Sequence, residues 1–301
     1  KLSDETLTGT EIKVLKNNAY SLNDKYGKSG IEAAMESYLR GTNGIKTTTT
    51  GSDGAVTEEY LSKPVQGNTV VTTIDGELQK IATQALADML VDNKNLAYFG
   101  TAGAMIVMNC KTGAILANVS LPTYDITKYF TDYDKLIADK QSPLWNRGLQ
   151  SAYAPGSTMK PAIALASLEE EVITTESAEY CGGYFTLEDQ TFKCLSTHGY
   201  LNVTTALQKS CNLFFFETGQ KLGIDKMNKY CGLLGLGQKT GVELPEAEGV
   251  LASIANKEAA GQVWNPGDTV QAAIGQSDNL FTPLQLANYC ATIANGGTRM
   301  Q

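Results

Sequence analysis

Three features are missing from this sequence, and each absence excludes a class of protein. No stretch approaches about 18 consecutive apolar residues, so no part of it predicts a membrane-spanning helix. Basic residues are in deficit, with 24 Lys and Arg against 32 Asp and Glu, and the net charge of −8 leaves no positive field for nucleic acid or anionic lipid. No internal repeat is visible. The 301 residues, 42% of them hydrophobic, therefore predict one large or two ordinary globular domains.

The first 66 residues are polar and predict a separate segment. Their one clear amphipathic stretch is 31–39, where apolar residues at helical spacing predict a short helix. The run 47–54 is rich in Thr and Gly and too polar to pack, so it predicts an exposed hairpin tip or a mobile loop. Pro64 and Gly67 then mark a domain boundary.

Beyond this boundary, strands come first and helices follow. Residues 68–74 predict a strand, 76–90 a helix capped by Asp75, and 102–108 with 114–120 an antiparallel hairpin. Helical spacing then dominates, over 162–168, 204–219 and 282–295. Since the elements do not alternate strand with helix, the predicted fold class is α+β.

Ser157 and Lys160 form the most informative pair of residues. Pro155 and Gly156 supply a tight entry, so Ser157 falls at the first turn of a helix and Lys160 lies one turn later on the same face. A serine hydroxyl needs a base to become a nucleophile, and a desolvated lysine can be that base. The alternative interpretation, without a catalytic role, is that Ser157 caps the helix and Lys160 is a surface lysine.

A second motif favours the catalytic interpretation. Ser210-Cys211-Asn212 lies 53 residues after Ser157 and opens another apolar helix. The Ser210 hydroxyl can relay a proton, and the Asn212 amide can hold a substrate amide by donating and accepting at once. The two motifs in this order match the S-x-x-K and S-x-N pair of penicillin-binding proteins and serine β-lactamases.

Further motifs in the same order extend the likeness over most of the chain. They are 30–32 (GIE), 38–41 (YLRG), 72–75 (TTID), 78–79 (LQ), 146–147 (NR), 153–161 (YAPGSTMKP), 235–241 (GLGQKTG), 273–276 (AIGQ) and 282–286 (TPLQL). With these motifs the chain resembles the class B penicillin-binding proteins, the D,D-transpeptidases that cross-link peptidoglycan. The resemblance implies the transpeptidase fold, an antiparallel sheet with helices, over residues 67–301. It also implies that residues 1–66 are the end of the N-terminal pedestal, or dimerisation-like, domain.

The third motif of this family needs separate treatment. Lys239-Thr240-Gly241 spells the family's K-T-G triplet, yet it follows Ser210 by only 29 residues and is flanked by Gly and Pro, which predicts a loop. In the family the catalytic triplet lies later, on a sheet strand beside the nucleophile helix. We therefore interpret Lys239–Gly241 as a triplet that matches the K-T-G motif in sequence but is not the catalytic one. We expect the transpeptidase domain to be incomplete at the C-terminal end of this chain.

Four potential metal ligands cluster in the sequence, three of them between the two catalytic motifs and the fourth within the second motif. Cys181, Cys194, His198 and Cys211 are separated by 12, 3 and 12 residues, and His198 is the only histidine. Thiolates and imidazole in a set of four suit tetrahedral Zn(II). Around a helix start, side chains change direction, so Cys211 can point away from the cleft that Ser210 and Asn212 face. The alternatives are a Cys181–Cys194 disulfide or separate buried thiols.

The resemblance implies an acyl transfer in which Ser157 attacks the stem peptide, with β-lactams acylating the same serine. The alternatives are a serine β-lactamase, which needs an additional base that we do not find, and a non-catalytic β-lactam sensor or scaffold. It further implies a membrane glycosyltransferase partner and a place at the extracytoplasmic face of the cell membrane. Because this chain opens on Lys1 rather than Met, we expect an N-terminal anchor for that location to have been removed from it.

Overall fold

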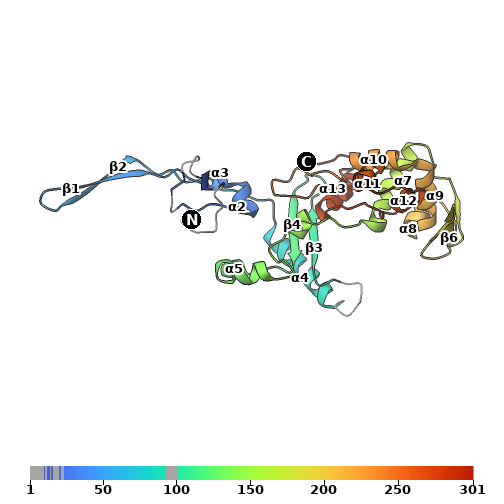
Figure 1. The fold of residues 1–301 in the computed structure, drawn as a ribbon, viewed down its shortest axis with the longest axis horizontal. Coiled ribbons are helices and arrows are strands. Elements are labelled where there is room, and N and C mark those ends of the chain that lie inside the picture. Colours follow the sequence, from blue (N-terminus) through green and yellow to red (C-terminus); the bar gives the residue numbers. More distant parts are fainter. Residues whose placement is uncertain are drawn as a thin grey trace. The chain divides into compact units, whose positions relative to one another are not determined.

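The computed structural model of the chain describes residues 10, 12, 13, 15, 20, 21, 24–92 and 100–300 (Figure 1). The chain divides into two compact units. The first comprises Lys1–Thr72 with Glu243–Pro245, and the second comprises Thr73–Val242 with Glu246–Gln301. No helix in the described part of the chain has both the length and the hydropathy that crossing a bilayer demands.

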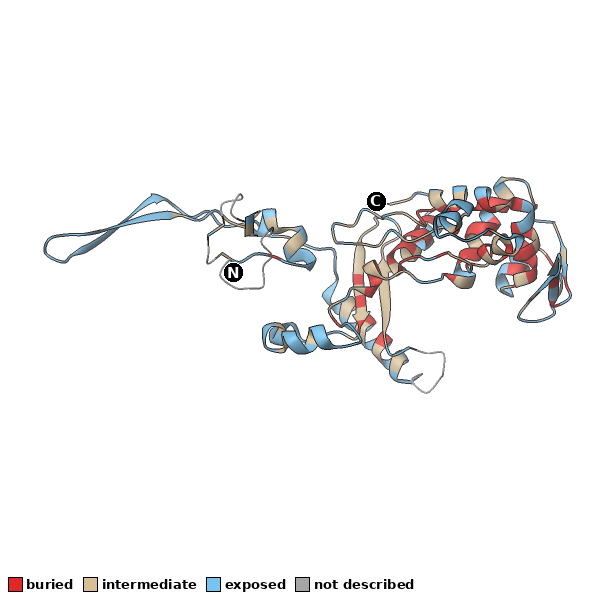
Figure 2. Ribbon diagram, in the orientation of Figure 1, coloured by how far each residue is buried: buried red, intermediate tan, exposed pale blue. Residues whose placement is uncertain are grey.

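The first unit contains a short helical stretch and a hairpin. The predicted helix 31–39 is confirmed, although Met35 interrupts it and leaves two pieces, α2 (Gly30–Ala34) and α3 (Glu36–Leu39). The hairpin consists of β1 (Ile45–Thr50) and β2 (Val56–Ser62), paired antiparallel and exposed along both strands (Figure 2). The run 47–54 was predicted as an exposed hairpin tip or a mobile loop. Residues 47–50 instead belong to β1, and residues 51–54 lie in the turn between the two strands.

The second unit starts with a helix packed on a two-stranded antiparallel sheet. The strands β3 (Gly103–Met108) and β4 (Ile115–Leu121) form the predicted hairpin, and α4 (Gly76–Asp92) packs on it through Ala82 and Leu86. Asp75 caps α4, as predicted, by accepting from the backbone N–H groups of residues 77 and 78.

The predicted strand 68–74 is wrong, because the structure describes all seven residues and assigns them to no strand. A β-branched sequence is compatible with a strand but does not supply the neighbouring strand that a ladder requires. Thr73, at the end of this segment, donates its hydroxyl to the carbonyl of Ile115 without forming a ladder.

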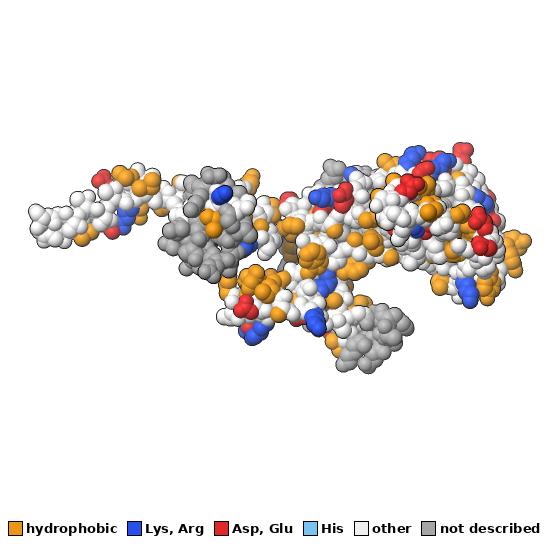
Figure 3. Space-filling view, viewed as in Figure 1, with side chains coloured by type: hydrophobic (Ala, Val, Ile, Leu, Met, Phe, Trp, Pro, Cys, Tyr) orange, Lys and Arg blue, Asp and Glu red, His pale blue; other side chains and the backbone are white. Residues whose placement is uncertain are grey.

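The remainder of the second unit is mostly helical and contains the main core. Phe214, Phe215 and Phe216 of α9 lie at the centre of this core and are almost fully buried. The helices are α5 (Tyr129–Ala138), α6 (Arg147–Gln150), α7 (Lys160–Glu169), α8 (Val203–Gln208), α9 (Asn212–Leu222), α10 (Ile224–Leu233), α11 (Ile254–Ala259), α12 (Pro266–Ala272) and α13 (Pro283–Ala294), with 3-10 turns η1 (Ile126–Lys128) and η2 (Gly156–Met159). On the face that Figure 3 shows, acidic and basic side chains of this unit are intermixed.

Two small hairpin-like sheets lie between α7 and α8 in sequence. In the first, β5 (Glu179–Cys181) pairs with β8 (Gly199–Leu201), and in the second, β6 (Tyr184–Leu187) pairs with β7 (Gln190–Lys193). With these sheets, the β3–β4 hairpin and the helical core, the α+β class predicted from the sequence is confirmed.

Candidate active site and metal cluster

Ser157 lies in a 3-10 turn that leads directly into a helix. The turn η2 ends at Met159, α7 begins at Lys160, and the Lys160 backbone N–H donates to the carbonyl of Ser157. Gly156 enters the turn with φ of +56°, a left-handed conformation that glycine adopts without a Cβ penalty. The turn leaves Ser157 exposed and buries Lys160.

Lys160 is buried among hydrogen-bond acceptors. Its side chain is only 1% exposed, and Nζ donates to Ser210 O at 2.8 Å, Ser210 Oγ at 3.1 Å and Asn212 Oδ1 at 2.7 Å. Burial lowers the pKa of Lys160 from 10.5 to about 8, because an ammonium loses its hydration there. A lysine with such a pKa is partly neutral near physiological pH and can accept a proton.

Ser210 takes its position from a break between two helices. The helical spacing over 204–219 is interrupted there: the chain leaves α8 after Gln208 and starts α9 at Asn212, which confirms the helix that Ser210-Cys211-Asn212 was predicted to open. Ser210 itself has φ of +49°, which is uncommon for a residue other than glycine and a conformation that the surrounding structure must support. The break turns both the carbonyl and the hydroxyl of Ser210 toward Lys160.

The structure therefore brings Lys160, Ser210 and Asn212 together in one hydrogen-bonded group. Ser157 lies one turn before Lys160, and among the described residues its hydroxyl has no hydrogen-bond partner. An exposed hydroxyl one turn before a buried amine, with a second hydroxyl on that amine, is an arrangement that can support nucleophilic attack by Ser157 and proton transfer through Ser210.

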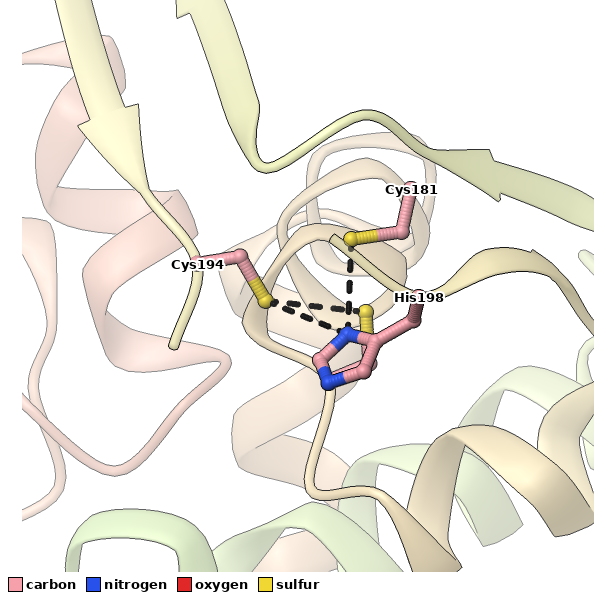
Figure 4. A group of neighbouring side chains, drawn as sticks. Cys181, Cys194 and His198 are labelled. Carbon is pink, nitrogen blue, oxygen red and sulfur yellow. Dashed lines mark hydrogen bonds between the residues drawn. The ribbon is translucent and has the colours of Figure 1, made fainter. Parts of the chain in front are cut away.

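The four predicted metal ligands also converge, into a cluster of three thiols and one imidazole (Figure 4). Their ligand atoms all lie within 4.8 Å of one another. His198 Nδ1 is 3.4 Å from Cys181 Sγ and 3.7 Å from Cys194 Sγ, and the sulfur atoms of Cys194 and Cys211 are 3.8 Å apart. This cluster could hold a metal ion. All six cysteines of the chain are free, so the Cys181–Cys194 disulfide is not formed.

Short segments around the two small sheets supply the cluster. Cys181 ends β5, Cys194 follows β7 and His198 precedes β8, while Cys211 caps α9 by accepting from the Phe214 backbone N–H. Burial raises the pKa of Cys194, but hydrogen bonds from backbone N–H groups, that of Leu213 first, outweigh burial and bring the pKa to about 7. Burial raises the pKa of Cys211 to about 12. One thiol of the cluster is thus readily ionised to the thiolate that a metal requires.

The cluster and the lysine site share a backbone segment. Cys211 points into the cluster while its neighbours Ser210 and Asn212 contact Lys160, as the change of direction at a helix start predicts. The Asn212 backbone N–H also donates to Cys194 Sγ at 3.2 Å. Any displacement of this sulfur therefore acts directly on the start of α9.

Lys239–Gly241 lies in a loop after α10, as predicted, and the polar groups of Thr240 and Gly241 are already hydrogen-bonded. Glu246 accepts from Thr240 N at 3.0 Å, Thr240 Oγ1 at 2.8 Å and Gly241 N at 3.0 Å. The triplet thus closes a local turn around one carboxylate.

Sequence reasoning missed Tyr289, whose hydroxyl donates to the carbonyl of Thr158 at 3.2 Å. The residue lies on α13 and is 1% exposed, so it supports the Ser157 turn from within the core. The only signal was an aromatic hydroxyl in the helical stretch 282–295, which did not indicate its target.

Comparison with known proteins identifies the families that match this chain. The penicillin-binding protein transpeptidase domain matches residues 103–301, and the penicillin-binding protein dimerisation domain matches residues 5–72. The peptidoglycan D,D-transpeptidase MrdA of Acinetobacter baumannii is 33% identical over 302 residues, which cover 96% of this chain and 43% of that protein. The chain thus spans less than half the length of this relative.

Two solved structures are similar over nearly the whole chain. One belongs to a peptidoglycan synthase complex described as coordinating polymerisation and crosslinking, with 33% identity, a TM-score of 0.87 and coverage of 97% of this chain and 52% of that one. The other is the penicillin-binding protein PBP2 of Helicobacter pylori in complex with MreC, with 30% identity, a TM-score of 0.81 and coverage of 96% and 54%.

Proposed function

The chain belongs to the penicillin-binding protein transpeptidase family, and from this we propose that it is a serine D,D-transpeptidase that cross-links peptidoglycan stem peptides. Ser157 forms the acyl-enzyme, and β-lactams acylate the same residue. The observation that carries the proposal is the buried Lys160 amine, whose pKa of about 8 and position one turn from an exposed serine fit a general base.

In the acylation step, Ser157 Oγ attacks the carbonyl carbon of the penultimate D-Ala and gives its proton to Lys160 Nζ. The bond from this carbon to the nitrogen of the terminal D-Ala then breaks, and the leaving nitrogen takes a proton through Ser210 Oγ, which lies 3.1 Å from Nζ. An amine of a neighbouring stem peptide next attacks the ester, forms the new amide and returns the proton to Ser157. Atoms and charges balance without a further reactant.

Asn212 has two roles in this proposal. Its Oδ1 orients the Lys160 amine at 2.7 Å, and its side-chain N–H groups remain able to donate to a substrate carbonyl. The start of α9 adds the positive end of a helix dipole near the reacting groups.

We also propose that Cys181, Cys194, His198 and Cys211 hold a structural Zn(II). Three thiols and an imidazole are a preferred set for tetrahedral zinc, and such closed sites contribute to folding stability. The mutual approach of all four ligand atoms supports this assignment. The zinc would stiffen the segment that positions Ser210 and Asn212.

Residues 1–66 are proposed as the end of the pedestal domain and 67–301 as part of the transpeptidase domain. The similarity to a chain from a synthase complex supports a membrane glycosyltransferase partner, and peptidoglycan as substrate supports a location at the extracytoplasmic face of the cell membrane. Stem peptides and β-lactams are the small partners that the proposed chemistry requires.

Labelling of the full-length protein with a fluorescent penicillin tests the proposal. We expect one label per chain, a mass shift on the peptide that contains Ser157, and no label on Ser157→Ala. Labelling that survives this substitution would contradict the assignment. Rapid release of the label would favour the β-lactamase alternative, and a stable label without transpeptidation of stem peptides would favour the sensor.

A further inference from the structure

The turn 275–278 lies directly against the backbone of the Ser157 turn. Gly156 N donates to Gly275 O at 2.8 Å, and a Cβ on Gly275 would lie 2.1 Å from Gly156 O, so no side chain fits between the two backbones. Two further hydrogen bonds, both 2.9 Å, join Tyr153 to Phe281. The position of Ser157 therefore depends on where the segment 275–281 is held.

A partly buried lysine connects this turn to the rest of the molecule. The Lys257 ammonium forms an ion pair with Asp268 and lies 3.6 Å from Asp278 Oδ2. The Lys257 side chain is 13% exposed, and its ammonium lies 5.5 Å from the centre of the Trp264 ring. One cation from α11 thus joins a carboxylate of α12 to a carboxylate of the turn.

Asp268 adds a second connection to the same turn. It accepts from the Asn265 backbone N–H at 2.8 Å, which fixes it at the start of α12, and from Ser277 Oγ at 3.4 Å. Ser277 has φ of +59°, a conformation that is unfavourable for a residue other than glycine and persists only where its surroundings hold it. Lys257 and the two aspartates thus form a charged group next to this residue.

We propose that Lys257 is a positioning residue for the acylation reaction: by pairing with Asp268 and Asp278 it holds the turn 275–278 against Gly156 and so fixes Ser157 relative to Lys160. This inference rests on the proposed function. Without the Lys257 cation, the two carboxylates repel each other and the turn loses its link to α11. A small displacement of a nucleophile slows a reaction strongly even when substrate binding is unchanged.

Stopped-flow acylation of the full-length protein by a fluorescent penicillin tests the proposal, because it separates the acylation rate constant from the dissociation constant of the preceding complex. We expect Lys257→Gln to lower the rate constant about tenfold with the dissociation constant within about twofold. Lys257→Arg keeps the charge and should restore most of the rate. Asp278→Asn, at a half-exposed position, provides a second variant that keeps the Lys257–Asp268 pair and should lower the rate less.

Lys229→Gln is the matched control, because it also removes a lysine from a carboxylate, Glu170 at the end of α7, but lies on α10. We expect its acylation rate constant to equal that of the wild type. The inference is overturned if folded Lys257→Gln has the wild-type acylation rate constant. It is also overturned if Lys229→Gln lowers this rate constant as much as Lys257→Gln does.

Hydrogen exchange of the peptide covering residues 153–160 gives a readout that does not depend on activity. We expect faster exchange in Lys257→Gln than in Lys229→Gln, because the Gly156 N–H is bonded to the turn. If the wild-type protein is not acylated at Ser157, the proposed function is contradicted. The comparison of hydrogen exchange between Lys257→Gln and Lys229→Gln still tests whether Lys257 holds the turn 275–278 against Gly156. Unchanged exchange in that peptide contradicts this inference.

Discussion

Lys160 Nζ lies 2.7 Å from Asn212 Oδ1, although 52 residues separate them in sequence. Together with the carbonyl and hydroxyl of Ser210, this gives the ammonium three acceptors for its three N–H groups. All three acceptors are uncharged, so they orient the amine without the Coulombic attraction by which a carboxylate would keep it protonated. Burial therefore dominates and lowers the pKa of Lys160 to about 8.

Lys160→Arg should abolish acylation of Ser157 while preserving the positive charge. A guanidinium does not release its proton near neutral pH, so it cannot serve as the base. We expect the acylation rate constant to fall by roughly a hundredfold to ten-thousandfold. Because the site is 1% exposed, the larger side chain should also lower the free energy of unfolding by about 1–3 kcal/mol. Acylation kinetics of the folded fraction, measured beside urea unfolding, separate the two effects; near-normal kinetics would remove Lys160 as the base.

The acylation rate should rise with pH through about 8. The neutral form of Lys160 is the active base, and a group with a pKa of about 8 becomes neutral as the pH passes that value. At pH 6 only a minor fraction is neutral, so the rate should be well below its plateau above pH 9. Rate constants measured from pH 6 to 9.5 check this, and a rate that is flat across the whole range would contradict the assignment.

Asn212→Asp should move this pH profile upward. A carboxylate at the position of Oδ1 stabilises the ammonium and should raise the pKa of Lys160 by about 1–3 pH units. The rate near pH 7.5 then falls about eightfold or more and recovers in more alkaline buffer. Asn212→Ala is the control, since it removes the amide without adding charge and should lower the rate at every pH. Identical profiles for the two variants would show that Asn212 does not act through the lysine.

The sequence predicted which residues meet in this site but not how the backbone brings them there. The residue types and spacings of Ser157, Lys160, Ser210 and Asn212 are local signals, and the structure places the last three in one group. The 3-10 turn at Ser157 and the left-handed Ser210 depend on tertiary contacts, which local spacing does not encode. The motif Ser210-Cys211-Asn212 predicted a helix start, which α9 confirms, but the helical spacing over 204–219 did not indicate that α8 ends at Gln208 or that Ser210 has a positive φ.

Long-range pairing was the least predictable part of the fold. The hairpin β3–β4 was predicted because its two strands are close in sequence, whereas 68–74 has strand-like residues and no ladder partner. Likewise, Tyr289 supports Thr158 across 131 residues. The metal cluster was an intermediate case, since its residue types indicated a site but only the fold brings β5, β7 and α9 together.

The triplet Lys239-Thr240-Gly241 should prove structural when it is mutated. Lys239→Ala removes an exposed side chain and should leave both acylation and stability unchanged. Glu246→Ala removes the acceptor of three hydrogen bonds and should lower the free energy of unfolding by about 1–3 kcal/mol, again without changing the acylation rate constant of the folded protein. A large loss of acylation in Lys239→Ala would instead assign this triplet to the catalytic cleft.

Zinc should be present at about one ion per chain in purified protein. Elemental analysis measures this directly, and Cys181→Ala should abolish the signal. Cys290→Ser is the matched control, because Cys290 is exposed and outside the cluster, and it should retain the metal. Zinc that persists in Cys181→Ala at full occupancy would place the ion elsewhere.

Removal of the metal should affect both stability and catalysis. Zinc that binds only the folded state stabilises it by mass action, by about 4 kcal/mol when its free concentration is a thousand times its dissociation constant. A chelator should therefore lower the unfolding midpoint, and added zinc should restore it. The acylation rate should fall as well, because the ligand Cys211 lies between Ser210 and Asn212, and Cys194 Sγ accepts from the Asn212 backbone N–H.

A disulfide predicts the opposite pattern, in which a reductant destabilises the protein and a chelator has no effect. Metal-free protein with four free thiols from its six cysteines would exclude the zinc site and leave the serine chemistry untouched.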